Sequence, residues 1–154
     1  MRKRAGANVN ACLFEEGLEK EAERVLNAAE SLIKKSRTVV IYTSRKVLDP
    51  GNIDQEELLA LSVRISDSIS RIVSDLSVRP KFIIAKGGIT SSDIATKGLS
   101  IKKAVVIGQI RKGIPVWRMG EESKFPQMTY VIFPGNVGAD STLCEIIDEL
   151  NWSL

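Results

Sequence analysis

The sequence predicts an α/β fold: a three-layer sandwich whose sheet is mostly parallel or mixed, with helices on both faces. Two observations lead to this class. Segments with helical apolar periodicity alternate along the chain with short runs of β-branched apolar residues. In addition, 154 residues with 44% apolar and 27% charged side chains are typical of one globular domain with a proper core.

The N-terminal part predicts a tail, a helix and a buried strand. Residues 1–14 show no clear period and are interpreted as a tail or as the remnant of an interdomain linker, which leaves 15–154 as the α/β domain. Apolar residues recur every three or four positions from Glu15 to Lys35, as an amphipathic helix requires. The next run, "RTVVIYTS", is β-branched and polar at its end, which is typical of a buried strand.

A second helix is predicted after the turn signal "DPGN". Asp54 and Glu57 have the spacing of a capping box, in which the first side chain accepts from the backbone N–H three residues on. Apolar residues then recur at helical spacing from Leu58 to Leu76, and Pro80 ends the helix.

The C-terminal half predicts four more strands and two more helices. "KFIIA" is a short apolar strand, and a helix capped by Thr90 or Ser91 follows it through about Lys97, with Gly98 in a left-handed C-terminal position. "KAVVIGQI" and "IPVWRM" are separated by "RKG" and predict a hairpin. "MTYVIFP" is the last strand, and "STLCEIIDEL" is the closing helix.

Composition excludes several classes of function. With 22 Lys and Arg against 19 Asp and Glu and no long run of like charge, neither a nucleic-acid nor a membrane partner is indicated. The sequence shows no secretory signal and no bilayer-spanning apolar run, so we expect a soluble, cytoplasmic protein. The absence of histidine excludes Ser-His and Cys-His catalysis and His-ligated zinc within this chain. Cys12 and Cys144 form no metal-binding pattern, and no metal site is predicted.

Two glycine-bearing loops follow predicted strands, at the position where open α/β sheets bind ligands. In the first, "GGITSSD", Gly87 and Gly88 allow the backbone to approach a ligand closely or to adopt positive φ. The helix that opens there directs unsatisfied amides outward, and Thr90, Ser91 and Ser92 add hydroxyl donors. This combination suits a phosphate chain.

The second loop, "PGNVGAD", has Gly135 and Gly138 on either side of Asn136, whose amide can contact a ribose or a base or simply tolerate a left-handed turn. Each loop alone is equally well interpreted as an ordinary strand-to-helix turn, whereas two of them after successive strands of one sheet favour ligand binding. Ser44, in "YTSR", would lie at the same sheet edge. A simple solvated strand end is the alternative for that residue.

Four segments together resemble a known family. "VVIYTSR", "GGITSSDIATKGL", "VIGQIRKGIPVWRMG" and "YVIFPGNVGADSTLCEII" follow one another as in the C-terminal nucleotide-binding domain of the four-carbon sugar acid kinases. The resemblance covers roughly residues 15–151. Members of that family use ATP to phosphorylate acids such as threonate and erythronate, and they hold the acid largely with a separate N-terminal α/β domain.

The resemblance implies a nucleotide site and the absence of a substrate site. Ser44 would touch the nucleotide, the Gly87–Thr90 loop with its bulky Ile89 would wrap the phosphates, and the Gly135–Gly138 loop would close over the nucleotide. ATP and Mg²⁺ are the implied cofactors. The acidic "ADDLTGA"-like motif of the family's N-terminal domain has no match here. The sugar acid would therefore be held by that missing domain, the catalytic residues stay unknown, and this chain alone would be inactive.

Two other hypotheses stay open. The chain could be a non-catalytic α/β module whose glycine loops are structural and whose exposed surface docks a partner domain or a second copy. It could instead bind another small anion, such as a sugar phosphate. Association into a homodimer fits both the kinase and the docking hypotheses.

Overall fold

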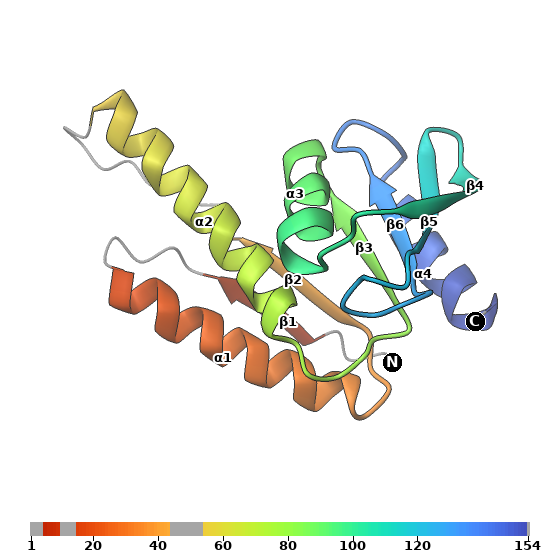
Figure 1. Cartoon of the computed structure of the whole chain (residues 1–154), viewed down its shortest axis with the longest axis horizontal. Coiled ribbons are helices and arrows are strands. Elements are labelled where there is room, and N and C mark those ends of the chain that lie inside the picture. Colours follow the sequence, from red (N-terminus) through yellow and green to blue (C-terminus); the bar gives the residue numbers. More distant parts are fainter. Residues whose placement is uncertain (1–4, 10–14, 44–53, 154) are drawn as a thin grey trace. The chain divides into compact units, whose positions relative to one another are not determined.

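The computed structural model describes residues 5–9, 15–43 and 54–153. The chain divides into two compact units, Met1–Val78 and Arg79–Leu154. Each unit has its own sheet, of two strands in the first and four in the second (Figure 1). Nothing in the residue pattern indicates this division. No helix among the described residues is long and apolar enough to cross a lipid bilayer.

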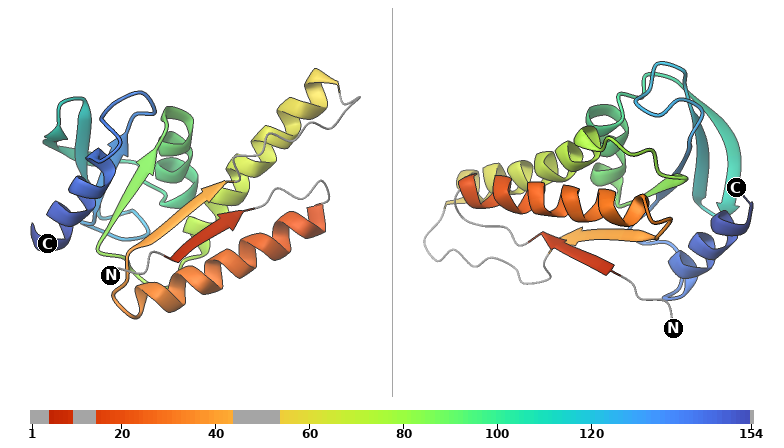
Figure 2. Two further views of the ribbon diagram at one scale, coloured as in Figure 1. Left: turned by 180° about the vertical axis from the view of Figure 1, so that it is seen from behind. Right: turned by 90° about the horizontal axis from the view of Figure 1, so that it is seen from below.

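The first unit is a small parallel sheet with two long helices. Its elements are β1 (Ala5–Val9), α1 (Glu15–Ile33), β2 (Val39–Thr43) and α2 (Gln55–Asp75). Strands β1 and β2 pair in parallel, with Ala5 opposite Val39, and lie side by side along α1 (Figure 2). The prediction that the N-terminal segment is irregular is therefore wrong for residues 5–9. The interpretation of 1–14 as a linker remnant stays a prediction.

Helical periodicity explains the core of this unit. Leu18 and Val25 of α1, seven residues apart and so on one helix face, pack against Ile72 of α2 and Ile41 of β2. The start of α2 is fixed as the spacing predicts, because Asp54 Oδ1 accepts from Glu57 N at 2.8 Å.

The second unit contains both glycine loops. Its elements are β3 (Phe82–Lys86), α3 (Gly88–Asp93), a π-helical segment η1 (Ile94–Gly98), β4 (Ala104–Arg111), β5 (Ile114–Met119), β6 (Thr129–Phe133) and α4 (Thr142–Ser153). The strand order is β3-β6-β5-β4. Strands β3 and β6 pair in parallel, whereas β5 is antiparallel to both β6 and β4, which confirms the predicted hairpin.

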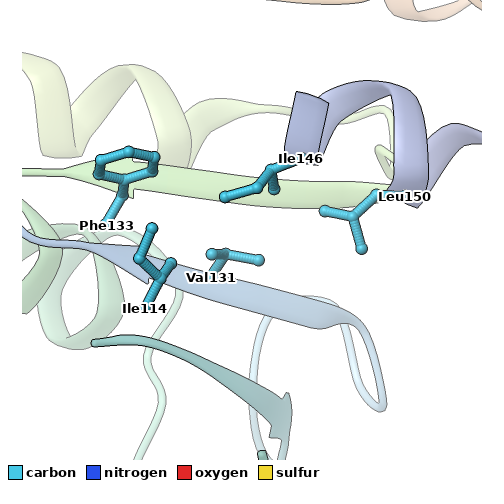
Figure 3. Close-up of a cluster of buried hydrophobic side chains, with 5 residues drawn as sticks. All are labelled: Ile114, Val131, Phe133, Ile146 and Leu150. Carbon is cyan, nitrogen blue, oxygen red and sulfur yellow. The ribbon is translucent and has the colours of Figure 1, made fainter. Parts of the chain in front are cut away.

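One face of this sheet is covered by α4. Neighbouring residues on a strand point to opposite faces, so Val131 and Phe133 share one face of β6 and Tyr130 lies on the other. Val131 and Phe133 are buried with Ile146 and Leu150 of α4, as Figure 3 shows. This cluster, which also includes Ile114, is the core between sheet and helix.

The opposite face of the sheet holds α3. The Tyr130 hydroxyl, fully buried, donates to Ser91 O at 2.7 Å and so joins α3 to the middle of β6. Burial also raises the pKa of Tyr130, which therefore remains a neutral donor. With α3 on one face and α4 on the other, this unit is a three-layer sandwich with a mixed sheet, and the predicted α/β class is confirmed.

Three local predictions are wrong. Gly87 is the N-cap of α3, so Thr90 and Ser91 lie inside the helix rather than at its cap. Gly98 ends η1 without positive φ. Strand β2 pairs with β1, so the strand that precedes Ser44 is in a different sheet from β3 and β6, which precede the two glycine loops.

The Tyr130 bond makes a stability prediction. We expect Tyr130→Phe to lower the free energy of unfolding by about 1 kcal/mol, because it removes the buried bond from the hydroxyl to Ser91 O, although that carbonyl still accepts from the Ile94 N–H. Tyr42→Phe is the matched control, since Tyr42 is 48% exposed. Urea denaturation of both variants measures the difference, and equal stability of the two would contradict a structural role for the bond.

Candidate functional site

The parallel register of β3 and β6 brings the two glycine loops to one edge of the sheet. Lys86 and Phe133 are the last paired residues of the two strands, and each loop starts directly after them. The Gly87 N–H then donates to Phe133 O at 2.8 Å, which extends the ladder by one bond. The first and second loops therefore begin side by side.

The glycines in these loops have two different roles. Gly87 has φ +108° and Gly138 has φ +85°, conformations that L side chains rarely adopt. A Cβ on Gly138 would also lie 3.0 Å from the Thr142 side chain. These two glycines are required by the fold.

Gly88 and Gly135 are not required by the fold. Neither has positive φ, and a Cβ built on either would meet no atom within 4 Å. Both residues are exposed. The space next to each backbone is therefore open to a ligand, and it is open on both loops at the same edge.

A lysine that sequence reasoning missed lies at this edge. Lys86 Nζ is 3.3 Å from Gly135 O and 3.5 Å from Pro134 O, and it lies 4.3 Å above the Phe133 ring. The last residue of β3 thus places a positive charge beside the second loop. Its position directly before two glycines was the available signal, but only the pairing with β6 shows where the charge lies.

The side chains predicted to bind in the first loop differ in availability. Ser91 is buried, and its Oγ lies 2.6 Å from Gly87 O and 2.8 Å from Ala85 O, so its hydroxyl hydrogen is used within the protein. Thr90 is half-buried, and Ile89 is 78% exposed. Ser91 therefore positions the loop, whereas Thr90 and the backbone beside it remain accessible.

Hydrogen bonds between Ala139 and Thr142 fix the far end of the second loop. The Ala139 N–H donates to Thr142 Oγ1 at 2.9 Å, and the Thr142 N–H donates to Ala139 O at 3.1 Å. Val137 packs against the α4 core. Asn136 and Gly135 stay exposed beside Lys86. Ser44, predicted for the same site, lies outside the described residues.

An open groove continues from Gly88 along the α3 face of the sheet. It encloses about 380 Å³. Its lining comes from α3 and η1, the 101–103 segment and strands β4, β5 and β6: Gly88, Ser91, Ser92, Ala95, Thr96, Ile101, Lys102, Lys103, Ala104, Val106, Trp117 and Ile132.

Glu122 holds the far end of this groove in place. Its Oε1 accepts from Lys103 N at 2.6 Å and from Lys102 N at 2.9 Å. Hydrogen bonds from its own backbone N–H and from Lys103 N lower the pKa of the Glu122 carboxyl, and the weaker effect of desolvation opposes them. The carboxylate lies over Gly120, where a Cβ would collide with it. Within the described residues, no group of three Asp, Glu or Cys side chains could hold a metal ion.

Most of the sequence, across both units of the chain, matches a described family. A family model, the nucleotide-binding C-terminal domain, matches residues 2–143. The chain belongs to that family. The match begins at residue 2 and so includes β1, and it confirms the nucleotide-binding part of the resemblance. No curated protein matches this nucleotide-binding domain.

Solved structures share the fold of the nucleotide-binding domain. A protein from Salmonella typhimurium LT2, described as a putative tRNA synthase, has a TM-score of 0.73 and 19% identity over 95% of this chain and 35% of its own. A DUF1537 protein from Bordetella bronchiseptica, a domain-swapped dimer with bound citrate, has a TM-score of 0.64 and 12% identity over 94% of this chain and 35% of its own. A DUF1537 protein from Haemophilus influenzae has a TM-score of 0.55 and 15% identity over 99% of this chain and 42% of its own.

Because the glycines have two different roles, substitution by alanine should reduce the stability of the fold strongly at one pair and weakly at the other. We expect Gly87→Ala and Gly138→Ala each to lower the free energy of unfolding by at least about 1 kcal/mol, because alanine is strained at positive φ. Gly88→Ala and Gly135→Ala should change it by less than about 0.5 kcal/mol. Urea denaturation measures all four. A large loss for Gly88→Ala would show that the fold itself needs this glycine.

Glu122 predicts a pH dependence of stability. Since the folded-state pKa is below the usual 4.5, the carboxylate stabilises the protein above that pH, and this contribution is lost as the pH falls through the folded value. Glu122→Gln should therefore lower the melting temperature at pH 7, and the difference from wild type should shrink below about pH 4.5. Glu23→Gln, in an exposed position of α1, is the control variant. A constant difference at all pH values would contradict the role of the charge.

Proposed function

We propose that this chain is the ATP-binding part of a longer kinase that phosphorylates a four-carbon sugar acid, and that the two glycine loops hold the phosphate chain. The observation that carries the proposal is the pair Gly88 and Gly135. Two glycines that the fold does not require lie on adjacent loops at one edge, next to a lysine, in a chain of a nucleotide-binding family. Close backbone approach to an anion explains both glycines.

Backbone donors for the phosphates come from the start of α3. The Ser91 N–H makes the first bond inside the helix, to Gly87 O at 2.9 Å. The N–H groups of Gly88, Ile89 and Thr90 precede it and have no carbonyl one turn earlier within the helix. Helical structure continues from α3 through η1 to Gly98, so these donors lie at the positive end of a helical run of 88–98. The Gly87 N–H is not among them, because Phe133 O uses it.

Lys86 supplies a positive charge for the phosphates, and the second loop closes over the nucleotide. The ammonium group of Lys86 is held at the carbonyls of Pro134 and Gly135, where it can neutralise a phosphate bound between the loops. Asn136, exposed next to Gly135, is the side chain that can hydrogen-bond the ribose or a phosphate oxygen. Ser44 is assigned to the same nucleotide by the family resemblance alone.

Mg²⁺ would accompany ATP in this proposal and would supply positive charge that screens the phosphates. Such an ion keeps several water ligands and needs only one or two carboxylates from the protein. Asp140, exposed at the end of the second loop, is a carboxylate of the required kind.

The acid substrate belongs to the rest of the longer protein. This chain spans 35% to 42% of the similar structures, which leaves room in such proteins for a second domain. Phosphoryl transfer requires the acceptor and the γ-phosphate to be held in line, so this chain alone should bind nucleotide and turn it over negligibly. The citrate in the Bordetella protein, a hydroxy acid, supports an acid substrate. The domain-swapped dimer of that protein supports the prediction of a homodimer.

Calorimetric titration tests the proposal. We expect ATP to bind, Gly88→Val to abolish binding with a modest loss of stability, and Lys86→Met to weaken it about tenfold through loss of one charge-assisted contact. Lys81→Met is the control, because Lys81 is exposed directly before β3, at the opposite end of that strand from both glycine loops. A folded protein that binds neither ATP nor ADP would overturn the proposal. Tighter binding of a sugar phosphate than of ATP would favour the other-anion hypothesis instead.

A further inference from the structure

The groove beside Gly88 has no role in the site built so far. We infer that it is the nucleoside subsite: the base of the nucleotide lies over Trp117 and Val106, and the ribose lies along α3. This inference rests on the proposed function and adds the direction in which the nucleotide lies.

The floor of the groove is apolar and left uncovered. Val106 is opposite Trp117 in the β4–β5 pair, and Trp117 is opposite Tyr130 in the β5–β6 pair, so the three lie in one row across the sheet. Val106 is 64% exposed although it lines a concave surface. Trp117 is half-buried, with its ring centroid 6.4 Å from that of Tyr130. A flat aromatic base is a suitable partner for such a surface, because it buries apolar area and stacks on the indole.

The groove has the length that a nucleotide needs. Trp117 is level with Tyr130, and Gly87 is bonded to Phe133, three residues further along β6. At about 3.3 Å per residue this separates the two levels by roughly 10 Å. Base and β-phosphate of an extended nucleotide are separated by a comparable distance. Gly88 lines the groove and also opens the phosphate loop, so the two sites are continuous.

The walls of the groove offer polar groups to a ribose. Ser92 and Thr96 are four residues apart, on one face of the helical run, and both are exposed in the lining. Thr96 Oγ1 donates to Ser92 O at 2.8 Å, which leaves the Ser92 hydroxyl as a donor and acceptor for a sugar hydroxyl. Lys102 and Lys103, fixed by Glu122, close the end next to β4.

Trp117 itself provides the test. The chain has two tryptophans, and Trp152 is 86% exposed on α4, so Trp152→Phe leaves Trp117 as the only indole reporter. Titration of this variant with ATP should change the emission of Trp117. Inorganic tripolyphosphate should compete with ATP in calorimetry, bind more weakly, and leave the emission unchanged.

Two neighbouring valines give a matched pair of variants. Val105 and Val106 are 67% and 64% exposed on the same strand, but only Val106 lines the groove. Val106→Asp should weaken ATP binding at least about tenfold, because it places a charge against the base. Val105→Asp adds the same charge on the opposite face of the sheet and should leave the affinity for ATP unchanged. Neither variant should alter the affinity for tripolyphosphate.

The outcomes separate the two proposals. ATP binding with unchanged Trp117 emission, equal affinities for ATP and tripolyphosphate, or equal effects of the two valine variants would each overturn the nucleoside subsite and leave the phosphate site intact. Absence of ATP binding to the folded wild-type chain would overturn the proposed function and this inference with it.

Discussion

The parallel pairing of β3 with β6 is the constraint on which the candidate site depends. Because both strands run the same way and end at Lys86 and Phe133, the two loops that follow must start at one edge. A shift of the register by one residue would reverse the faces of Tyr130 and Val131 and separate α3 and α4 from their contacts. The same pairing therefore specifies the three layers and the position of the site.

Much of the second unit could be predicted from local patterns. The strands, the hairpin and the two glycine loops follow from apolar runs and turn residues near in sequence. The roles of the individual glycines could not be predicted, because Gly87 and Gly88 are distinguished by φ, by the space around a Cβ and by the bond from Gly87 N–H to Phe133 O, all of which depend on the folded structure. Lys86 was missed for a related reason: its contact with Gly135 joins residues that are 49 positions apart.

The first unit was predicted less completely. The helices α1 and α2 have long periodic apolar faces, and they were found. Strand β1 has the sequence "AGANV", with too few β-branched or large apolar residues to indicate a strand by itself. Pairing with "VVIYT" of β2 compensates for that weak propensity, which is a tertiary effect that local reasoning does not detect. The separation into two sheets is equally a property of pairing partners rather than of any segment.

The bonds around Gly87 make the two loops unequal in stiffness. The first is tied to β6 through the Gly87 amide, to its own strand through Ser91 and to the sheet through Tyr130. Such a loop is preorganised, and a ligand meeting it loses little free energy to chain ordering. Gly135 and Asn136 have no comparable set of ties among the described residues. We expect the entropy cost of ligand binding to fall mainly on the second loop. The first loop would then act as a rigid template, and the second would adapt to the bound ligand.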